Sequence, residues 1–207
     1  MRLKPSIKRK IIIFIIIVLF IVGIVIYLKY FDNKEKIKSK ITNEIKEYNY
    51  VLKDSNSSEY KDEFDNLKKI LSSKNIKEED YVKSISKLFV IDFYTLDNKI
   101  AKTDVGGKQF VHKEALDNFL IKSQDTIYKY VENNLYGERK QVLPHVKDTN
   151  VTKINKVSYS YKDKKDDNAY EVVISWEYKK GTAEGYQESA TLYFVHEAKQ
   201  LFLVELK

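Results

Sequence analysis

The sequence predicts an α+β protein with one apolar helix near its N-terminus, further helices after it, and a curved antiparallel sheet of four strands. Three observations support this. An uninterrupted apolar run fills residues 11–28, apolar residues then recur at helical spacing, and after Gly137 they alternate with polar ones. The two periods distinguish helices from half-buried strands. Because the helices precede the strands, the two halves should be segregated, as in α+β folds.

The apolar run is the strongest local signal. IIIFIIIVLFIVGIVIYL has no charged side chain, and as a helix it extends over about 27 Å, close to the hydrocarbon thickness of a bilayer. No pair of small residues follows it at the spacing that signal peptidase requires. We therefore predict an uncleaved transmembrane signal anchor over residues 11–30. The residues flanking it at the membrane surface are Lys8, Arg9, Lys10, Tyr27 and Tyr30.

The basic residues bear on orientation. The net charge is +7, but five basic residues lie in the first ten, which leaves +2 (7 − 5) for the rest. A basic tail over residues 1–10 predicts a cytoplasmic N-terminus, although the other flank also carries five basic residues. The sequence thus predicts a single-pass protein of the cell membrane, with the lipid bilayer as a partner and an extracytoplasmic C-terminal domain. No dense basic patch follows, so direct nucleic-acid binding is not expected.

Residues 31–54 are predicted to form a helical stalk, because apolar side chains recur there at helical spacing. The narrow stripe consists of Ile37, Ile41, Ile45, Tyr48 and Leu52. Two interpretations stay open: the stalk pairs with a second copy of the chain, or it lies on its own domain. Two heptads are too few to define a coiled coil. A homo-oligomer is therefore one candidate assembly.

The α+β domain should occupy residues 55–207 and begin with helices. Polar residues 54–58 interrupt the stalk pattern, and Gly106 with Gly107 marks a turn that needs unusual backbone angles. The last helix should run from about 113 to 132. Its predicted inner face consists of Leu116, Phe119, Leu120, Ile127 and Val131.

Four strands should complete the domain. Their alternating runs are 157–161, 170–178, 190–195 and 201–206. Short polar connections make consecutive strands antiparallel neighbours, which predicts a meander with one packed face. The helices should cover the face that carries Tyr170, Ile174 and Trp176.

No motif for catalysis, metal binding or cofactor binding is found. The chain has no Cys, which excludes disulfides and thiolate ligands, and its three histidines show no metal-binding spacing. Asp92, Asp97 and Asp104 are carboxylates that a fold can bring together, which sequence alone cannot show. We therefore predict no catalytic residue, no metal and no cofactor, and we expect that the protein is not an enzyme.

The order of elements resembles a known family. A cytoplasmic stub, one span, helices ending at Phe93 and Tyr94, and a meander from Val151 to Leu206 resemble the bitopic assembly component of bacterial type IV secretion and conjugation systems. This resemblance implies a cone-shaped extracytoplasmic domain like nuclear transport factor 2 (NTF2-like). It also implies a non-enzymatic scaffold that oligomerises and holds other channel parts. It rests on element order and length, so no interface residues are carried over.

Two functional hypotheses follow. The favoured one is a membrane-anchored, non-catalytic scaffold or interaction protein of a bacterial cell-envelope machine for conjugative transfer, with other proteins of that machine as partners. The alternative is an extracytoplasmic domain that binds or senses a small ligand in a pocket between helices and sheet. The candidate lining residues of that pocket are Tyr170, Ile174, Trp176 and Phe119, although Trp176 on its alternating strand is first read as a core residue.

Overall fold

The computed structural model describes residues 5–32, 37–181 and 184–207, with the side chains of α1 described in part. The chain divides into two compact units, Met1–Ile37 and Lys38–Lys207.

The first unit contains helix α1, Pro5–Asp32. In the part of the chain that the structure describes, no helix is both long and apolar enough to cross a membrane. The described apolar side chains of α1 run from Ile13 to Tyr27 and are exposed. The finding that no described helix can cross a membrane corrects the predicted transmembrane signal anchor over 11–30. It also corrects the predicted single-pass membrane localisation and the bilayer as a partner.

The five predicted flanking residues are described only in part. Arg9 and Tyr27 lie on α1 and are exposed. The side chains of Lys8, Lys10 and Tyr30 lie outside the described residues. Their predicted place at a membrane surface depended on the corrected span.

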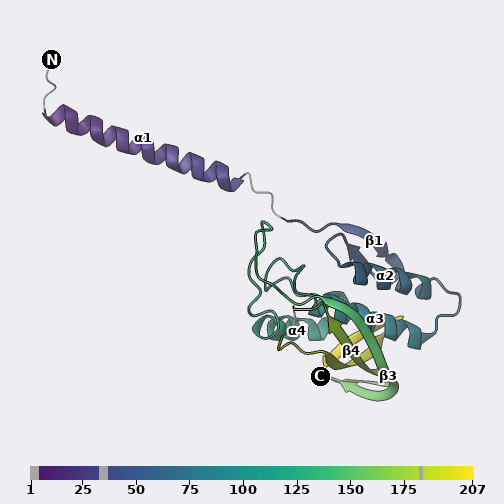
Figure 1. The fold of residues 1–207 in the computed structure, drawn as a ribbon. Helices are drawn as coiled ribbons and strands as arrows, with labels where there is room; N and C mark the ends of the chain where they lie inside the picture. The colour runs from purple at the N-terminus through teal and green to yellow at the C-terminus, as the bar shows by residue number, and fades with distance from the viewer. Residues whose placement is uncertain (1–4, 33–36, 182–183) are drawn as a thin grey trace. The chain divides into compact units, whose positions relative to one another are not determined.

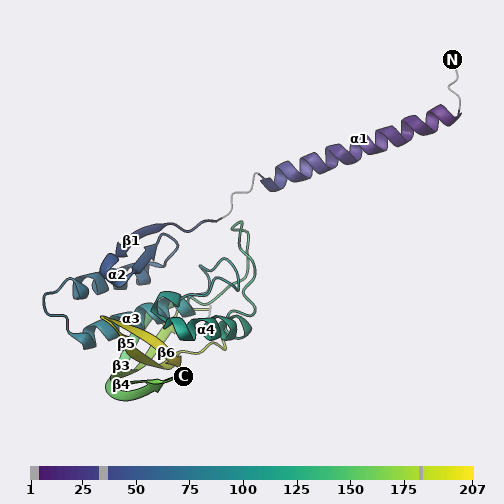
Figure 2. The same ribbon diagram turned by 180° about the vertical axis from the view of Figure 1, so that it is seen from behind.

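The second unit is an α+β domain in which α3 lies between two layers (Figures 1 and 2). A small hairpin and α2 lie on one side of α3, and the sheet lies on the other. The elements are β1 Ile41–Ile45, the 3-10 turn η1 Lys46–Tyr48, β2 Tyr50–Lys53, α2 Ser58–Leu71, α3 Glu78–Tyr94, η2 Lys108–Phe110, α4 Lys113–Asp125, β3 Val146–Tyr161, β4 Lys164–Tyr178, β5 Ser189–Glu197 and β6 Gln200–Leu206.

The larger sheet has the order β3-β4-β5-β6, and each strand is antiparallel to the next. This confirms the predicted meander of four strands. Both strands are longer than predicted: β3 begins at Val146 instead of 157, and β4 begins at Lys164 instead of 170, directly after a tight turn at Lys162, whose φ is 51°. The pairing of β3 with β4 is irregular in three places, one of them between Val157 and Tyr159. Such bulges bend a strand and increase its twist, which curves the sheet.

The core lies between α3 and the sheet. Tyr170, Ile174 and Trp176 are buried and face the helices, as predicted. The ring of Trp176 packs against Tyr94 of α3 with centroids 4.2 Å apart. The burial of large aromatic side chains is the main source of stability in such a core.

The predicted helical stalk over 31–54 is wrong in its described part. Residues 41–53 form the β1–β2 hairpin, which turns at Asn49 with φ 53°. Tyr48, Tyr50 and Leu52 are all buried. Their period of two indicates a strand, and Tyr50, which is 0% exposed, did not belong to the helical stripe. Residues 33–36 lie outside the described chain.

Helix α4 ends at Asp125, earlier than the predicted 132. The Ser123 hydroxyl donates to the Phe119 carbonyl and the Thr126 hydroxyl to the Lys122 carbonyl. Side chains thus supply hydrogen bonds to backbone carbonyls in the last turn of the helix. The chain then turns inward and buries Tyr128, whose hydroxyl donates to the Phe93 carbonyl at 2.6 Å. A buried hydroxyl needs a hydrogen-bond partner. Tyr128 reaches the Phe93 carbonyl from the segment that follows the end of α4.

Candidate functional site

A cavity of about 420 Å³ lies between α4, the end of β3 and strand β6. Ligand pockets in proteins commonly measure about 300 to 1,000 Å³. The lining residues are Phe93, Val111, Ala115, Asn118, Phe119, Lys122, Ser123, Thr126, Ile127, Tyr159, Tyr161, Leu203, Val204, Glu205 and Leu206. The cavity exists because the curved sheet brings the end of β3 back towards β6, beneath α4.

The base of the cavity is apolar and its rim is polar. Phe93 and Leu203 are 2% exposed, and Phe119 packs against Phe93 with ring centroids 5.1 Å apart. Asn118 and Lys122 of α4 are exposed and lie one helical turn apart. An apolar body with a few polar groups at one end would match this distribution.

Tyr159 and Glu205 close the opposite wall. The Tyr159 hydroxyl donates to the Glu205 carboxylate at 2.6 Å, and Lys207 lies 3.1 Å from the same oxygen. Partial burial would raise the pKa of Glu205, but these two hydrogen bonds outweigh it and lower the pKa. Burial raises the pKa of Tyr159, and its hydrogen bond to Glu205 raises it further, so this hydroxyl stays protonated. The wall therefore presents an ionised carboxylate that is already hydrogen-bonded.

The four residues predicted to line a pocket are divided between two places. Phe119 lines the cavity. Tyr170, Ile174 and Trp176 lie in the core beneath α3 and are not among the lining residues. The sequence missed Tyr159 and Glu205, because nothing local indicates that a strand end curls back to β6.

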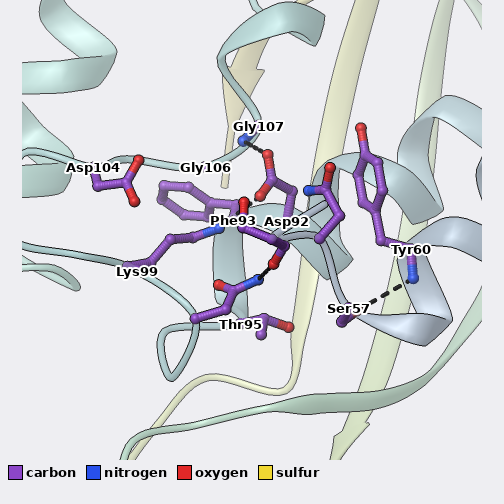
Figure 3. A network of polar contacts seen from close by, with 12 residues as sticks. Ser57, Tyr60, Asp92, Phe93, Thr95, Lys99, Asp104, Gly106 and Gly107 are labelled. Carbon is purple, nitrogen blue, oxygen red and sulfur yellow. Dashed lines mark hydrogen bonds and ion pairs between the residues drawn. The ribbon is translucent and has the colours of Figure 1, made fainter. Parts of the chain in front are cut away.

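A second, smaller recess of about 120 Å³ brings two of the three candidate carboxylates together. Asp92 pairs with Lys99, Nζ to Oδ1, at 2.6 Å and accepts the Gly107 amide at 2.7 Å (Figure 3). Asp104 lines the same recess and accepts the Ile100 amide at 3.1 Å. These bonds fix the loop between α3 and η2 to α3, which is a structural role.

Asp97 does not join this recess. Its carboxylate lies 2.8 Å from Nδ1 of His145, whose Nε2 is 3.1 Å from Glu59 and 2.9 Å from the Lys179 ammonium. Within the described residues, no group of three or more His, Asp or Glu side chains is placed to hold a metal ion. The predicted turn at Gly106 and Gly107 is confirmed, since Gly107 has φ 73°.

Comparisons of the chain with protein-family models, with curated proteins and with solved structures give no match. The resemblance to the type IV secretion component therefore stays a prediction, as does the NTF2-like assignment of the domain.

Proposed function

We propose that residues 38–207 form a non-catalytic binding module that holds a small, mainly apolar molecule in the cavity between α4, β3 and β6. The observation that supports this most directly is the cavity of about 420 Å³, which side chains leave unfilled. The cavity is partly open to solvent, so a small molecule can enter it, and its volume is within the range of ligand pockets.

The lining indicates the chemistry of the ligand. Phe93, Phe119, Tyr159 and Tyr161 supply aromatic surface, which favours flat or aliphatic groups. Lys122 is the lining cation and Glu205 the lining carboxylate, so the two charges cancel. A ligand with an apolar body and one polar end fits better than a multiply charged metabolite.

The polar groups of the lining favour binding over catalysis. Glu205 is engaged by Tyr159 and Lys207, and Ser123 donates to its own helix. A general base needs to reach a substrate proton, and a nucleophilic Ser needs an adjacent base. Neither arrangement is formed by the lining residues. The scaffold hypothesis has no contact in the described chain that favours it and stays a prediction.

The test uses anilinonaphthalene sulfonate, an apolar dye with one polar end that fluoresces when it leaves water. The full chain should bind it, and Ala115→Phe, which fills the cavity from α4, should weaken binding at least about tenfold. Ile121→Phe is the matched control, because Ile121 lies on α4, is 60% exposed and does not line the cavity.

Near-ultraviolet circular dichroism should show that both variants keep the fold. Dye held by the exposed side chains of α1 is common to both variants and cancels in the comparison. If Ala115→Phe binds the dye as tightly as Ile121→Phe does, the cavity is not the binding site and the proposal is wrong.

A further inference from the structure

His196 is hydrogen-bonded to the strand that pairs with the cavity wall. Tyr159, which lines the cavity, pairs in register with Asp166 across the tip of the β3–β4 hairpin. One oxygen of Asp166, Oδ2, accepts the backbone amide of His196 at 2.7 Å and lies 2.8 Å from its Nδ1. The hairpin tip, residues 158–167, is thereby joined to the end of β5.

The second nitrogen of His196 reaches another element. Nε2 lies 2.9 Å from Oε1 of Glu78, the first residue of α3, and the Tyr170 hydroxyl donates to Oε2 of the same carboxylate at 2.6 Å. Only a doubly protonated imidazole can donate to both carboxylates at once. The protonated ring therefore ties the hairpin tip, β5 and α3 together.

The other charges around His196 are few. Lys156 Nζ of β3 lies 3.8 Å from Glu78 Oε2. The negative charge of Glu79 in α3 helps to raise the pKa of Tyr170. Glu197, the next residue on β5, is paired with His112 and Lys113. Burial would lower the pKa of His196, but Asp166 and Glu78 outweigh it and raise the pKa.

We infer that protonated His196 is a latch that keeps the hairpin tip closed against the cavity, so that a bound ligand is released faster when His196 loses its proton. This inference rests on the proposed function and adds its regulation. Tyr159 is the link, because the strand opposite it carries the latched Asp166.

The direction of the pH effect follows from the two kinds of group. Because the pKa of His196 is raised in the folded state, its protonated form stabilises that state. This stabilisation is complete below about pH 6.5 and is lost as pH rises through the raised pKa. The pKa values of Asp166 and Glu78 are lowered despite burial, mainly by hydrogen bonds from His196 and, for Glu78, Tyr170. Their contribution is lost only as pH falls through those lowered values. The latch is thus closed below about pH 6.5 and opens as pH rises through the raised pKa of His196.

Opening should loosen the tip without unfolding it. Tyr159 still donates to Glu205, Tyr161 packs on His112 with centroids 5.3 Å apart, and Lys162 lies 3.4 Å from Glu114. Losing one hydrogen bond to a charged group changes a rate by about tenfold. We expect dye dissociation to quicken by about that factor.

Stopped-flow dissociation of anilinonaphthalene sulfonate from the full chain tests this at about pH 6 and about pH 9. Wild type should release the dye about tenfold faster at the higher pH, and His196→Gln should release it fast at both. His145→Gln is the matched control, because His145 also lies between two carboxylates, and neither it nor those carboxylates line the cavity. It should keep the wild-type pH profile. A wild-type profile in His196→Gln, or no pH effect in wild type, overturns the latch.

A readout without ligand separates this inference from the proposed function. If the dye does not bind at any pH, the cavity proposal has failed, and the latch is measured by amide hydrogen exchange of residues 158–167. Compared at the same pH, protection of the tip should fall in His196→Gln and stay unchanged in His145→Gln. Asp166→Asn, which keeps an oxygen for the His196 amide, serves if His196→Gln does not fold. Unchanged tip protection in the variant used would refute the latch.

Discussion

Lys99 and Asp92 form an ion pair of 2.6 Å inside the domain, where the Lys99 side chain is only 6% exposed. Burial would raise the pKa of Asp92, but the Lys99 charge and the Gly107 amide outweigh it and lower the pKa. Because Asp92 belongs to α3 and Lys99 to the loop after it, the pair fixes the start of that loop. The turn at Gly107 is fixed by the same carboxylate (Figure 3).

Removing the Lys99 charge should destabilise the domain strongly. Lys99→Met keeps the aliphatic stem but leaves a buried carboxylate without its cation, which costs about 3 kcal/mol or more. Urea unfolding followed by Trp176 fluorescence measures the loss. Lys165→Met is the control, because the pair of Lys165 with Asp167 is also 2.6 Å long but both side chains are more than 60% exposed. It should show little change, and equal losses in the two variants would contradict this account.

Gly107→Ala should cost more than its backbone angle explains. Gly107 and Gly185 have φ of 73° and 82°, so Ala is strained at both by about 1 kcal/mol. A Cβ on Gly107 would lie 2.7 Å from the ring of buried Phe89, whereas one on Gly185 meets nothing within 4 Å. Overpacking adds about 1 to 3 kcal/mol at Gly107 alone. Chemical unfolding of both variants measures this difference, and a Gly107→Ala loss no larger than that of Gly185→Ala would show that the ring yields.

The strand half was predictable because its signal is local. Alternation at Tyr170, Ile174 and Trp176 follows from the pleat alone, and it identified the buried face of β4. The β1–β2 hairpin was missed because a local pattern there fits two periods. Ile41, Ile45, Tyr48 and Leu52 fit a helical period by coincidence, and only counting Tyr50 would have favoured a strand.

The cavity and its latch could not be read from the sequence. Tyr159 and Asp166 pair across the β3–β4 turn, but His196 contacts Asp166 from β5, 30 residues further along the chain. Alternation is the same in a flat sheet and in a curved one, so it does not encode where the end of β3 lies. Likewise, Asp92 and Asp104 meet in one recess while Asp97 turns to His145, a choice made by the loop path.

His145 should make stability depend on pH. The hydrogen bond to Asp97 raises the pKa of His145, and the one to Glu59 raises it further. Burial and the positive charge of Lys179 lower it, but they are outweighed. Because this pKa is raised, the contribution of His145 to stability is complete below about pH 6.5 and is lost as pH rises through the pKa of the folded state. The free energy of unfolding should therefore fall by about 1 to 2 kcal/mol on the alkaline side. Urea unfolding across this range should show a smaller fall in His145→Gln, and an unchanged slope would assign the effect to other groups.

The same cluster acts differently in acid. Burial would raise the pKa of Glu59, but hydrogen bonds from its own backbone amide and from His145 lower it to about 2. Its contribution is present above the ordinary pKa of about 4.3 and is lost as pH falls towards 2. Glu59→Gln should therefore flatten the acid side of the stability profile, which the same unfolding series reports. A steep acid limb that persists in this variant would exclude Glu59 as its cause.

Two buried tyrosines should respond unequally to the loss of a hydroxyl. The hydroxyls of Tyr50 in β2 and Tyr81 in α3 lie 2.6 Å apart, and Tyr81 also accepts the Leu201 amide at 3.3 Å. Burial raises the pKa of Tyr81 to about 12, so both hydroxyls are neutral donors and acceptors at ordinary pH. Tyr50→Phe leaves Tyr81 with the amide and should cost about 1 kcal/mol.

Tyr81→Phe leaves the buried Leu201 amide without its partner and removes one hydrogen bond of the Tyr50 hydroxyl, which keeps its side-chain hydrogen bond with Gln200. An unsatisfied buried group costs about 1 to 3 kcal/mol, so this variant should lose about 2 to 3 kcal/mol in urea unfolding. The double variant should lose less stability than the sum of the two single variants, because both single variants remove the same hydrogen bond between the two hydroxyls. A larger loss in Tyr50→Phe than in Tyr81→Phe would reverse the order and show that the hairpin is anchored to α3 through Tyr50 by another contact.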